Sequence, residues 1–145
     1  EFSLPYSERV IAAVKAKYPE VPLILHANGG VGKLEIMTAS TADVIGLDWS
    51  TDMADARRIF GPDRVLQGNM DPMYLFADEV RIRREVAQNI AAAGSGKHIL
   101  NVGHGVVQGT PEANVGTFCD AARKAAYTNF HANTQDHEGV QSEAR

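Results

Sequence analysis

The chain has 145 residues, enough for one domain with a hydrophobic core. It is 44% hydrophobic and 22% charged, as soluble globular domains are, and its formal net charge of −4 is opposite to the basic surface that nucleic-acid binding requires. We therefore expect no nucleic-acid partner. The single cysteine, Cys119, cannot form an internal disulfide, and no apolar run approaches the roughly 18 residues that span a bilayer. These features predict a soluble chain in a reducing compartment, with no membrane segment.

Four short apolar runs predict buried β-strands. They are too short for helices and rich in leucine and β-branched residues, and they cover residues 21–25, 44–47, 65–66 and 99–102. Five helical patterns lie before, between and after them, each bounded by capping or helix-breaking residues. The helices are expected from Ser3 to Pro19, over residues 33–39, from Thr51 or Asp52 to Gly61, from Asp78 to Gly94, and from Thr110 onward.

Strands that are apolar throughout, alternating with helices, predict an α/β fold with a parallel sheet. The expected order is one helix followed by four strand-helix units. After Tyr127 the pattern becomes polar and loses its periodicity, so we expect a domain over residues 1–132 and a disordered polar tail over residues 133–145.

The carboxyl ends of the predicted strands should form the functional site, as they do in parallel α/β folds generally. All four strand ends change abruptly from apolar to polar and small residues, at 26–30, 48–50, 67–72 and 101–105. This predicts a shared pocket. The candidate side chains that could converge there are His26, Asp48, Asn69, Asp71 and His104.

Each candidate also has a structural interpretation. His104, between two glycines, could line the pocket or bond a neighbouring backbone carbonyl. Asp48 could cap the following helix while Trp49 covers the end of the sheet, and Asn69 and Asp71 could be structural in the same way. Cys119 is expected on the apolar face of a helix rather than as a nucleophile.

Two loops resemble nucleotide-binding motifs only weakly. Residues 27–34 nearly form a P-loop, but Ala27 replaces its first glycine and Leu34 replaces the Ser or Thr that holds magnesium. Residues 103–108 begin like a dinucleotide-binding turn, but Gln108 replaces the third glycine. The chain also lacks the His-x-x-x-His and Cys-x-x-Cys spacings of zinc sites, so we expect no bound metal.

Four blocks at these positions resemble the uroporphyrinogen decarboxylase family. They are FSLPY at 2–6, GLDW at 46–49, LQGNMDP at 66–72 and NVGHG at 101–105, in the order of that family. The resemblance covers residues 2–128. It implies a (β/α)₈ TIM barrel, whose typical length is about 250 residues, so the chain is expected to be the C-terminal half, strands five to eight.

The resemblance also implies an activity. The family removes carbon dioxide from the four acetate side chains of uroporphyrinogen III, giving coproporphyrinogen III in porphyrin biosynthesis, without metal or organic cofactor. Protonation of a pyrrole carbon makes the ring an electron sink, and the protein orients the substrate and places charge around it. His104 matches the histidine of the family's Gly-His-Gly turn, so we expect it to bind substrate.

The rest of the site is expected outside this chain. The substrate carries eight carboxylates, which call for arginines. The arginines before the tail are predicted on helices or at strand beginnings, away from the pocket: Arg9, Arg57, Arg58, Arg64, Arg81, Arg83, Arg84 and Arg123. The catalytic residues are expected in the N-terminal half, so the chain alone should be inactive. The full-length protein is expected to be a homodimer in the chloroplast, with the cytoplasm as the alternative.

Two other interpretations remain open. Zinc-dependent methyltransferases share this barrel, but they bind zinc through a His-x-Cys pair where this chain has His26, Ala27 and Asn28. Alternatively, the chain could be a complete, small, doubly wound module that binds a phosphorylated ligand at residues 28–33. Such a module would be stable alone, whereas half a barrel would leave two edge strands unpaired.

Overall fold

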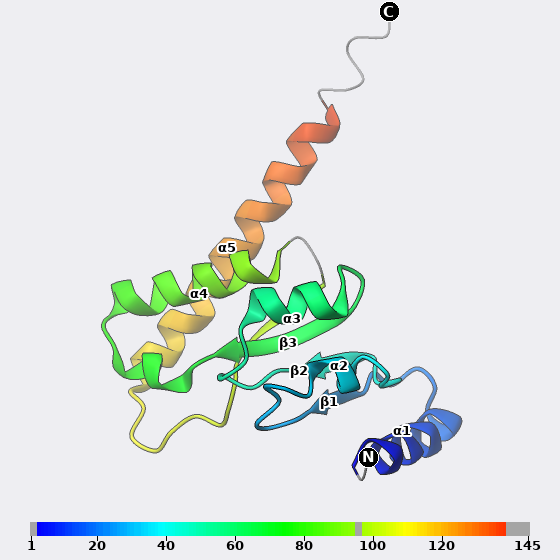
Figure 1. The fold of residues 1–145 in the computed structure, drawn as a ribbon. Helices are drawn as coiled ribbons and strands as arrows, with labels where there is room; N and C mark the ends of the chain where they lie inside the picture. The colour runs from blue at the N-terminus through cyan, green and yellow to red at the C-terminus, as the bar shows by residue number, and fades with distance from the viewer. Residues whose placement is uncertain (1–2, 95–96, 139–145) are drawn as a thin grey trace, which may run out of the picture.

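Four strand-helix units follow one another along the chain in the computed structural model, which describes residues 3–94 and 97–138 (Figure 1). The elements in chain order are α1 (Leu4–Lys17), β1 (Ile24–His26), α2 (Leu34–Met37), β2 (Val44–Gly46), α3 (Met53–Phe60), β3 (Val65–Met70), the 3₁₀ helix η1 (Pro72–Phe76), α4 (Glu79–Ala93), β4 (His98–Val102) and α5 (Glu112–Glu138). The expected α/β class, with one helix before four strand-helix units, is confirmed.

The strands form one parallel sheet in the order β1-β2-β3-β4. His26 pairs with Gly46, Gly46 with Gln67, and Gln67 with Ile99, so these four residues form one row across the sheet. The order never reverses, whereas a doubly wound sheet has a reversal at its ligand site. The doubly wound module is therefore wrong for this chain. A sheet that advances in one direction is consistent with part of a TIM barrel.

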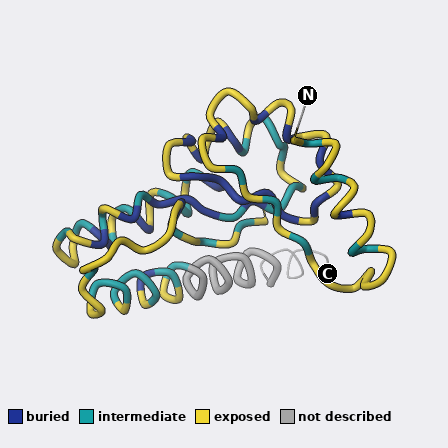
Figure 2. The backbone as a smooth tube through the Cα atoms, turned by 90° about the horizontal axis from the view of Figure 1, so that it is seen from below, coloured by how far each residue is buried: buried dark blue, intermediate teal, exposed yellow. Residues whose placement is uncertain are grey.

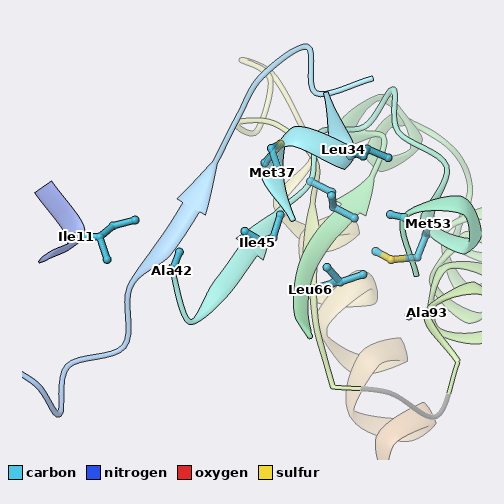
Figure 3. Packing of buried hydrophobic residues seen from close by; sticks show 10 residues of the cluster. Ile11, Leu34, Met37, Ala42, Ile45, Met53, Leu66 and Ala93 are labelled. Atoms are coloured by element: carbon cyan, nitrogen blue, oxygen red, sulfur yellow. The ribbon is translucent and has the colours of Figure 1, made fainter. Parts of the chain in front are cut away.

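The core lies between the sheet and the helices on one of its faces. Ile45 of β2 and Leu66 of β3 are fully buried in one cluster with Met53 and Ala56 of α3. Figure 3 shows the side chains of Ile45, Leu66 and Met53 in this cluster. A second cluster of Met70, Leu75, Val86 and Ala121 joins η1, α4 and α5 to the carboxyl-end half of β3. Right-handed connections that always advance in the same direction place their helices on the same face, which explains this one-sided core.

The opposite face of the sheet is open at its two edges. Ile24 and His26 of β1 and Ile99 and Asn101 of β4 are exposed, with Ile24 48% and Ile99 41% accessible. Figure 2 shows the buried stretches running through the middle of the molecule and exposed backbone around them. Within the described residues β1 and β4 are edge strands with one neighbour each, as expected for part of a barrel.

Two strands differ from the sequence prediction. β1 begins at Ile24 instead of residue 21, because Pro22 has no N–H and the N–H of Leu23 bonds the Asp43 carboxylate at 2.7 Å. β3 continues to Met70 instead of ending at residue 66, because its backbone pairs with β4 as far as Val102. Residues interpreted as a loop after β3 therefore belong to the strand.

Most helix ends follow the predicted caps. Asp52 accepts a hydrogen bond from the N–H of Asp55 at the start of α3, and Asp78 accepts one from Arg81 at the start of α4. The prediction missed η1, which Asp71 caps through the N–H of Met73.

The last helix, α5, runs to Glu138, so helix occupies the first six residues of the segment expected as a tail. Residues 139–145 of that segment lie outside the described residues. No helix in the described part of the chain is long and apolar enough to cross a membrane.

Candidate active-site pocket

A pocket of about 480 Å³ lies at the carboxyl ends of the strands, where the sequence predicts it. Its volume falls in the usual range of small-molecule sites, roughly 300–1,000 Å³. The polar side chains that line it are His26, Asn28, Gln67, Asn101 and His104. Two of the five sequence candidates, His26 and His104, are therefore brought together in one cavity.

His104 is placed by a close contact between two chain segments. The Trp49 N–H donates a hydrogen bond to the Gly103 carbonyl at 3.2 Å, and the Gly103 N–H donates one to Met70 at 2.8 Å. A Cβ atom on Gly103 would lie 2.2 Å from the Trp49 nitrogen, so only glycine fits. His104 follows directly, exposed, and its ring makes no hydrogen bond with the described residues. In the described part of the chain, the His104 ring is therefore not bonded to a neighbouring backbone carbonyl, which was its structural interpretation.

Asp48, directly after β2, is a buried structural carboxylate. Its side chain accepts hydrogen bonds from the Gly30 N–H at 2.9 Å and from the hydroxyls of Ser50 and Thr51 at 2.9 and 2.8 Å. Burial alone would raise the pKa of Asp48, but these hydrogen bonds outweigh it and hold the pKa below its usual value. Asp48 therefore stays charged and ties the loop after β1 to β2. It does not cap α3, which was the structural role suggested by the sequence.

Asn69 and Asp71 are also structural. The Asn69 amide donates to the carbonyls of Asp48 and Thr51 at 2.8 and 2.5 Å and accepts a hydrogen bond from Asn89 at 2.9 Å. Asp71 caps η1. Neither residue lines the pocket, so only two of the five candidates do.

Three polar residues of the pocket were not singled out from the sequence: Asn28, Gln67 and Asn101. A usable signal exists for Gln67, because Leu66 is buried against the helices and its neighbour in a strand must face the other way. In the same way, Asn101 faces the opposite side of β4 from its neighbour Leu100. Asn28 lies in a loop, where no periodicity helps.

The lining of the pocket carries no carboxylate and no arginine or lysine among the described residues. It offers imidazole rings and side-chain amides, all of which can donate hydrogen bonds. The described arginines lie elsewhere, as predicted: Arg57, for example, donates to the carbonyls of Gly61, Arg64 and Lys97, close to where β3 and β4 begin. The pocket can therefore receive an anionic group without repulsion from its lining, but it supplies no fixed positive charge.

The described residues contain no group of three or more His, Cys, Asp or Glu side chains that could hold a metal ion. His26 and Asn28 line the pocket, while Cys119 is half-buried on α5 and is not among the lining residues.

Comparison with known proteins identifies the family. The sequence profile of uroporphyrinogen decarboxylase (URO-D) matches residues 1–125. The chain belongs to the uroporphyrinogen decarboxylase family. It is 46% identical over 127 residues to the chloroplastic uroporphyrinogen decarboxylase of Nicotiana tabacum, a match that covers 88% of this chain and 32% of that protein. It is 48% identical over 122 residues to the enzyme of the cyanobacterium Picosynechococcus, covering 84% of this chain and 35% of the relative.

A chloroplastic form from Arabidopsis thaliana is 45% identical over 127 residues and is covered to 32% of its length. The chain therefore spans about a third of the curated relatives it matches. The family resemblance inferred from the four blocks is confirmed. The relatives named here are uroporphyrinogen decarboxylases.

Proposed function

We propose that this chain is part of a uroporphyrinogen decarboxylase that removes carbon dioxide from the four acetate side chains of uroporphyrinogen III and yields coproporphyrinogen III. The observation that carries the proposal is the pocket at the strand ends: it is lined by donor side chains, without a carboxylate, in a chain whose residues 1–125 match the family. A donor-lined pocket suits a substrate with many carboxylates.

His104 is the substrate-binding residue in this proposal. Its ring is exposed in the pocket and held there by the Gly103 contact with Trp49. An imidazole N–H can donate a hydrogen bond to a substrate carboxylate. Anchoring one carboxylate fixes the orientation of the macrocycle, which is what decarboxylation without a cofactor demands of the protein.

The chain alone should be inactive. The substrate needs fixed positive charge around its rim, and the described arginines lie outside the pocket. We assign these arginines and the catalytic groups to the N-terminal part of the whole protein. The whole protein is proposed to act as a homodimer, without cofactor, in the chloroplast, in keeping with the chloroplastic relatives from tobacco and Arabidopsis. The cytoplasm is the alternative location.

A segment swap tests the proposal. In the tobacco enzyme, the 127-residue segment that matches this chain is replaced by the corresponding residues of this chain. The purified swap should convert uroporphyrinogen III with a kcat/KM within about tenfold of the tobacco parent, a barrier difference of about 1.4 kcal/mol. The 145-residue chain by itself should give no product.

The matched control is the swap with His104→Ala. It should keep the circular dichroism spectrum and melting temperature of the swap while its KM rises about tenfold or more. A swap that folds like its parent but releases no carbon dioxide would contradict the proposed function. Unchanged kinetics in the His104→Ala variant would remove His104 from the site.

A further inference from the structure

We propose that His26 is a second substrate-binding residue, which holds a carboxylate on the opposite side of the pocket from His104. This inference rests on the proposed function and adds a residue to its binding site. His26 ends β1, one edge of the sheet, whereas His104 follows β4, the other edge. Both imidazoles line the same cavity.

The position of His26 depends on a glycine in the neighbouring strand. Gly46 of β2 pairs with His26, and a Cβ on Gly46 would lie 3.0 Å from Nδ1 and 3.1 Å from Cβ of His26. The imidazole thus occupies the space that a side chain at residue 46 would fill. Gln67 follows in the same row and also lines the pocket.

His26 is available to a ligand. It is exposed, and its ring makes no hydrogen bond with the described residues, unlike His98, whose Nε2 lies 2.8 Å from the Gly68 carbonyl. The buried carboxylate of Asp48 already accepts hydrogen bonds from Gly30 and two hydroxyls. A donor ring without an internal partner, in a pocket without a lining carboxylate, is suited to an external anion.

The spacing of the strands that carry the two histidines indicates what kind of anion suits the pocket. Three strand spacings of about 4.8 Å separate β1 from β4, or about 14 Å across the sheet. A small anion can accept hydrogen bonds from only a few of the donors in a cavity that is lined from both edges of the sheet. A macrocycle with carboxylates around its rim can reach both, with the amides of Gln67 and Asn101 between them. The two histidines therefore favour a large, flat polycarboxylate over a single phosphate or acetate.

The test uses the 145-residue chain with ¹³C-labelled histidine, titrated with uroporphyrin, the stable oxidised form of the proposed substrate. The ring signals are assigned with His26→Gln and His104→Gln variants. Both signals should shift and saturate with the same Kd, while the ring signal of His98 stays in place. Acetate at matched carboxylate concentration should not reproduce the paired shift.

The kinetic counterpart uses the segment swap. His26→Phe should raise KM about tenfold with kcat within about twofold, and His26→Gln, which keeps an N–H donor, should recover part of the loss. Ile24→Thr is the matched control on the same face of β1, since Ile24 is 48% exposed and does not line the pocket, and it should leave KM unchanged.

The outcomes separate this inference from the proposed function. A swap that decarboxylates while both His26 variants keep the parental KM, or a titration that shifts His104 without His26, overturns the role of His26 and leaves the proposed function standing. A titration that shifts neither ring also overturns it. A well-folded swap without any decarboxylase activity overturns the proposed function, and the role of His26 with it.

Discussion

Arg57 bonds four backbone carbonyls in or next to the two connections that lead into β3 and β4, and replacing it with methionine should destabilise the chain strongly. From α3 its guanidinium donates to the carbonyls of Ala93, Gly61, Arg64 and Lys97, at 2.9, 2.9, 2.8 and 2.9 Å. Burial lowers the pKa of Arg57, yet no carboxylate is among these four partners. The Arg57 side chain thus stabilises the fold through hydrogen bonds to backbone carbonyls and not through an ion pair with one of these partners.

The cost follows from those bonds. Three of them are partly buried, while the bond to Lys97 is exposed, so water can replace only the last. At about 1 kcal/mol net for each partly buried bond, Arg57→Met should lower the free energy of unfolding by about 3 kcal/mol. For a chain of this size that corresponds to a fall of about 9 °C in melting temperature. Arg57→Lys cannot reach all the carbonyls and should recover only about 1 kcal/mol.

Urea unfolding followed by circular dichroism at about 222 nm measures the effect. Arg58→Met is the matched control on the same helix, because the Arg58 side chain is 73% exposed and, among the described residues, pairs only with exposed Asp55. It should cost less than about 0.5 kcal/mol. If Arg57→Met and Arg58→Met unfold at the same urea concentration, the four carbonyl bonds do not stabilise the fold as argued.

Four further predictions concern the site and its surroundings. Burial and the nearby Arg57 guanidinium lower the pKa of His98 from its usual 6.5, so His98 binds a proton more readily in the unfolded chain than in the folded one. The stability of the fold should therefore decrease as the pH drops from 6.5 toward the folded pKa. Melting temperatures measured across this pH range should show a smaller decrease for the His98→Gln variant. Asp48→Asn should cost about 2 kcal/mol in urea unfolding, because its amide cannot accept both from the Gly30 N–H and from the two hydroxyls, and the Gly30 amide should exchange with deuterium faster. Gly103→Ala should cost about 3 kcal/mol, because its Cβ would lie 2.2 Å from backbone, whereas Gly105→Ala, with open space around it, should melt like the parent. Neither zinc nor ATP with magnesium should shift the melting temperature by more than about 1 °C.

The parts of the fold that were predicted correctly depend on local chemistry. Asp52 and Asp78 were identifiable as helix caps because a carboxylate before a helix bonds the exposed N–H groups of its first turn. The apolar run of β2 was identifiable because both of its faces are buried. The errors occur where the length of a strand depends on its neighbour in the sheet. β3 extends through polar residues up to Met70 because β4 pairs with them, and the sequence of β3 does not show how long β4 is.

The position of the candidate site was predicted correctly, but most of the residues that line it were not. All five candidates sit at strand ends, and sequence alone could not distinguish His26 and His104, which line the pocket, from Asp48 and Asn69, which are 1% and 4% exposed. The difference arises in part from partners that lie far away in the sequence: the Gly30 N–H bonds the Asp48 carboxylate, and the Asn89 amide bonds Asn69. Gln67 was missed because the strand was ended too early, which hid its alternation with Leu66.

We propose that this chain supplies part of the site at which uroporphyrinogen loses its four acetate carboxyl groups. The most direct test is mass spectrometry of the final product formed by the segment swap from uroporphyrinogen III, after oxidation to the porphyrin. We expect coproporphyrin III, with four carboxyl groups left of eight, and no product from a matched protein that lacks the swapped segment. Recovery of unchanged uroporphyrin from a well-folded swap would contradict it.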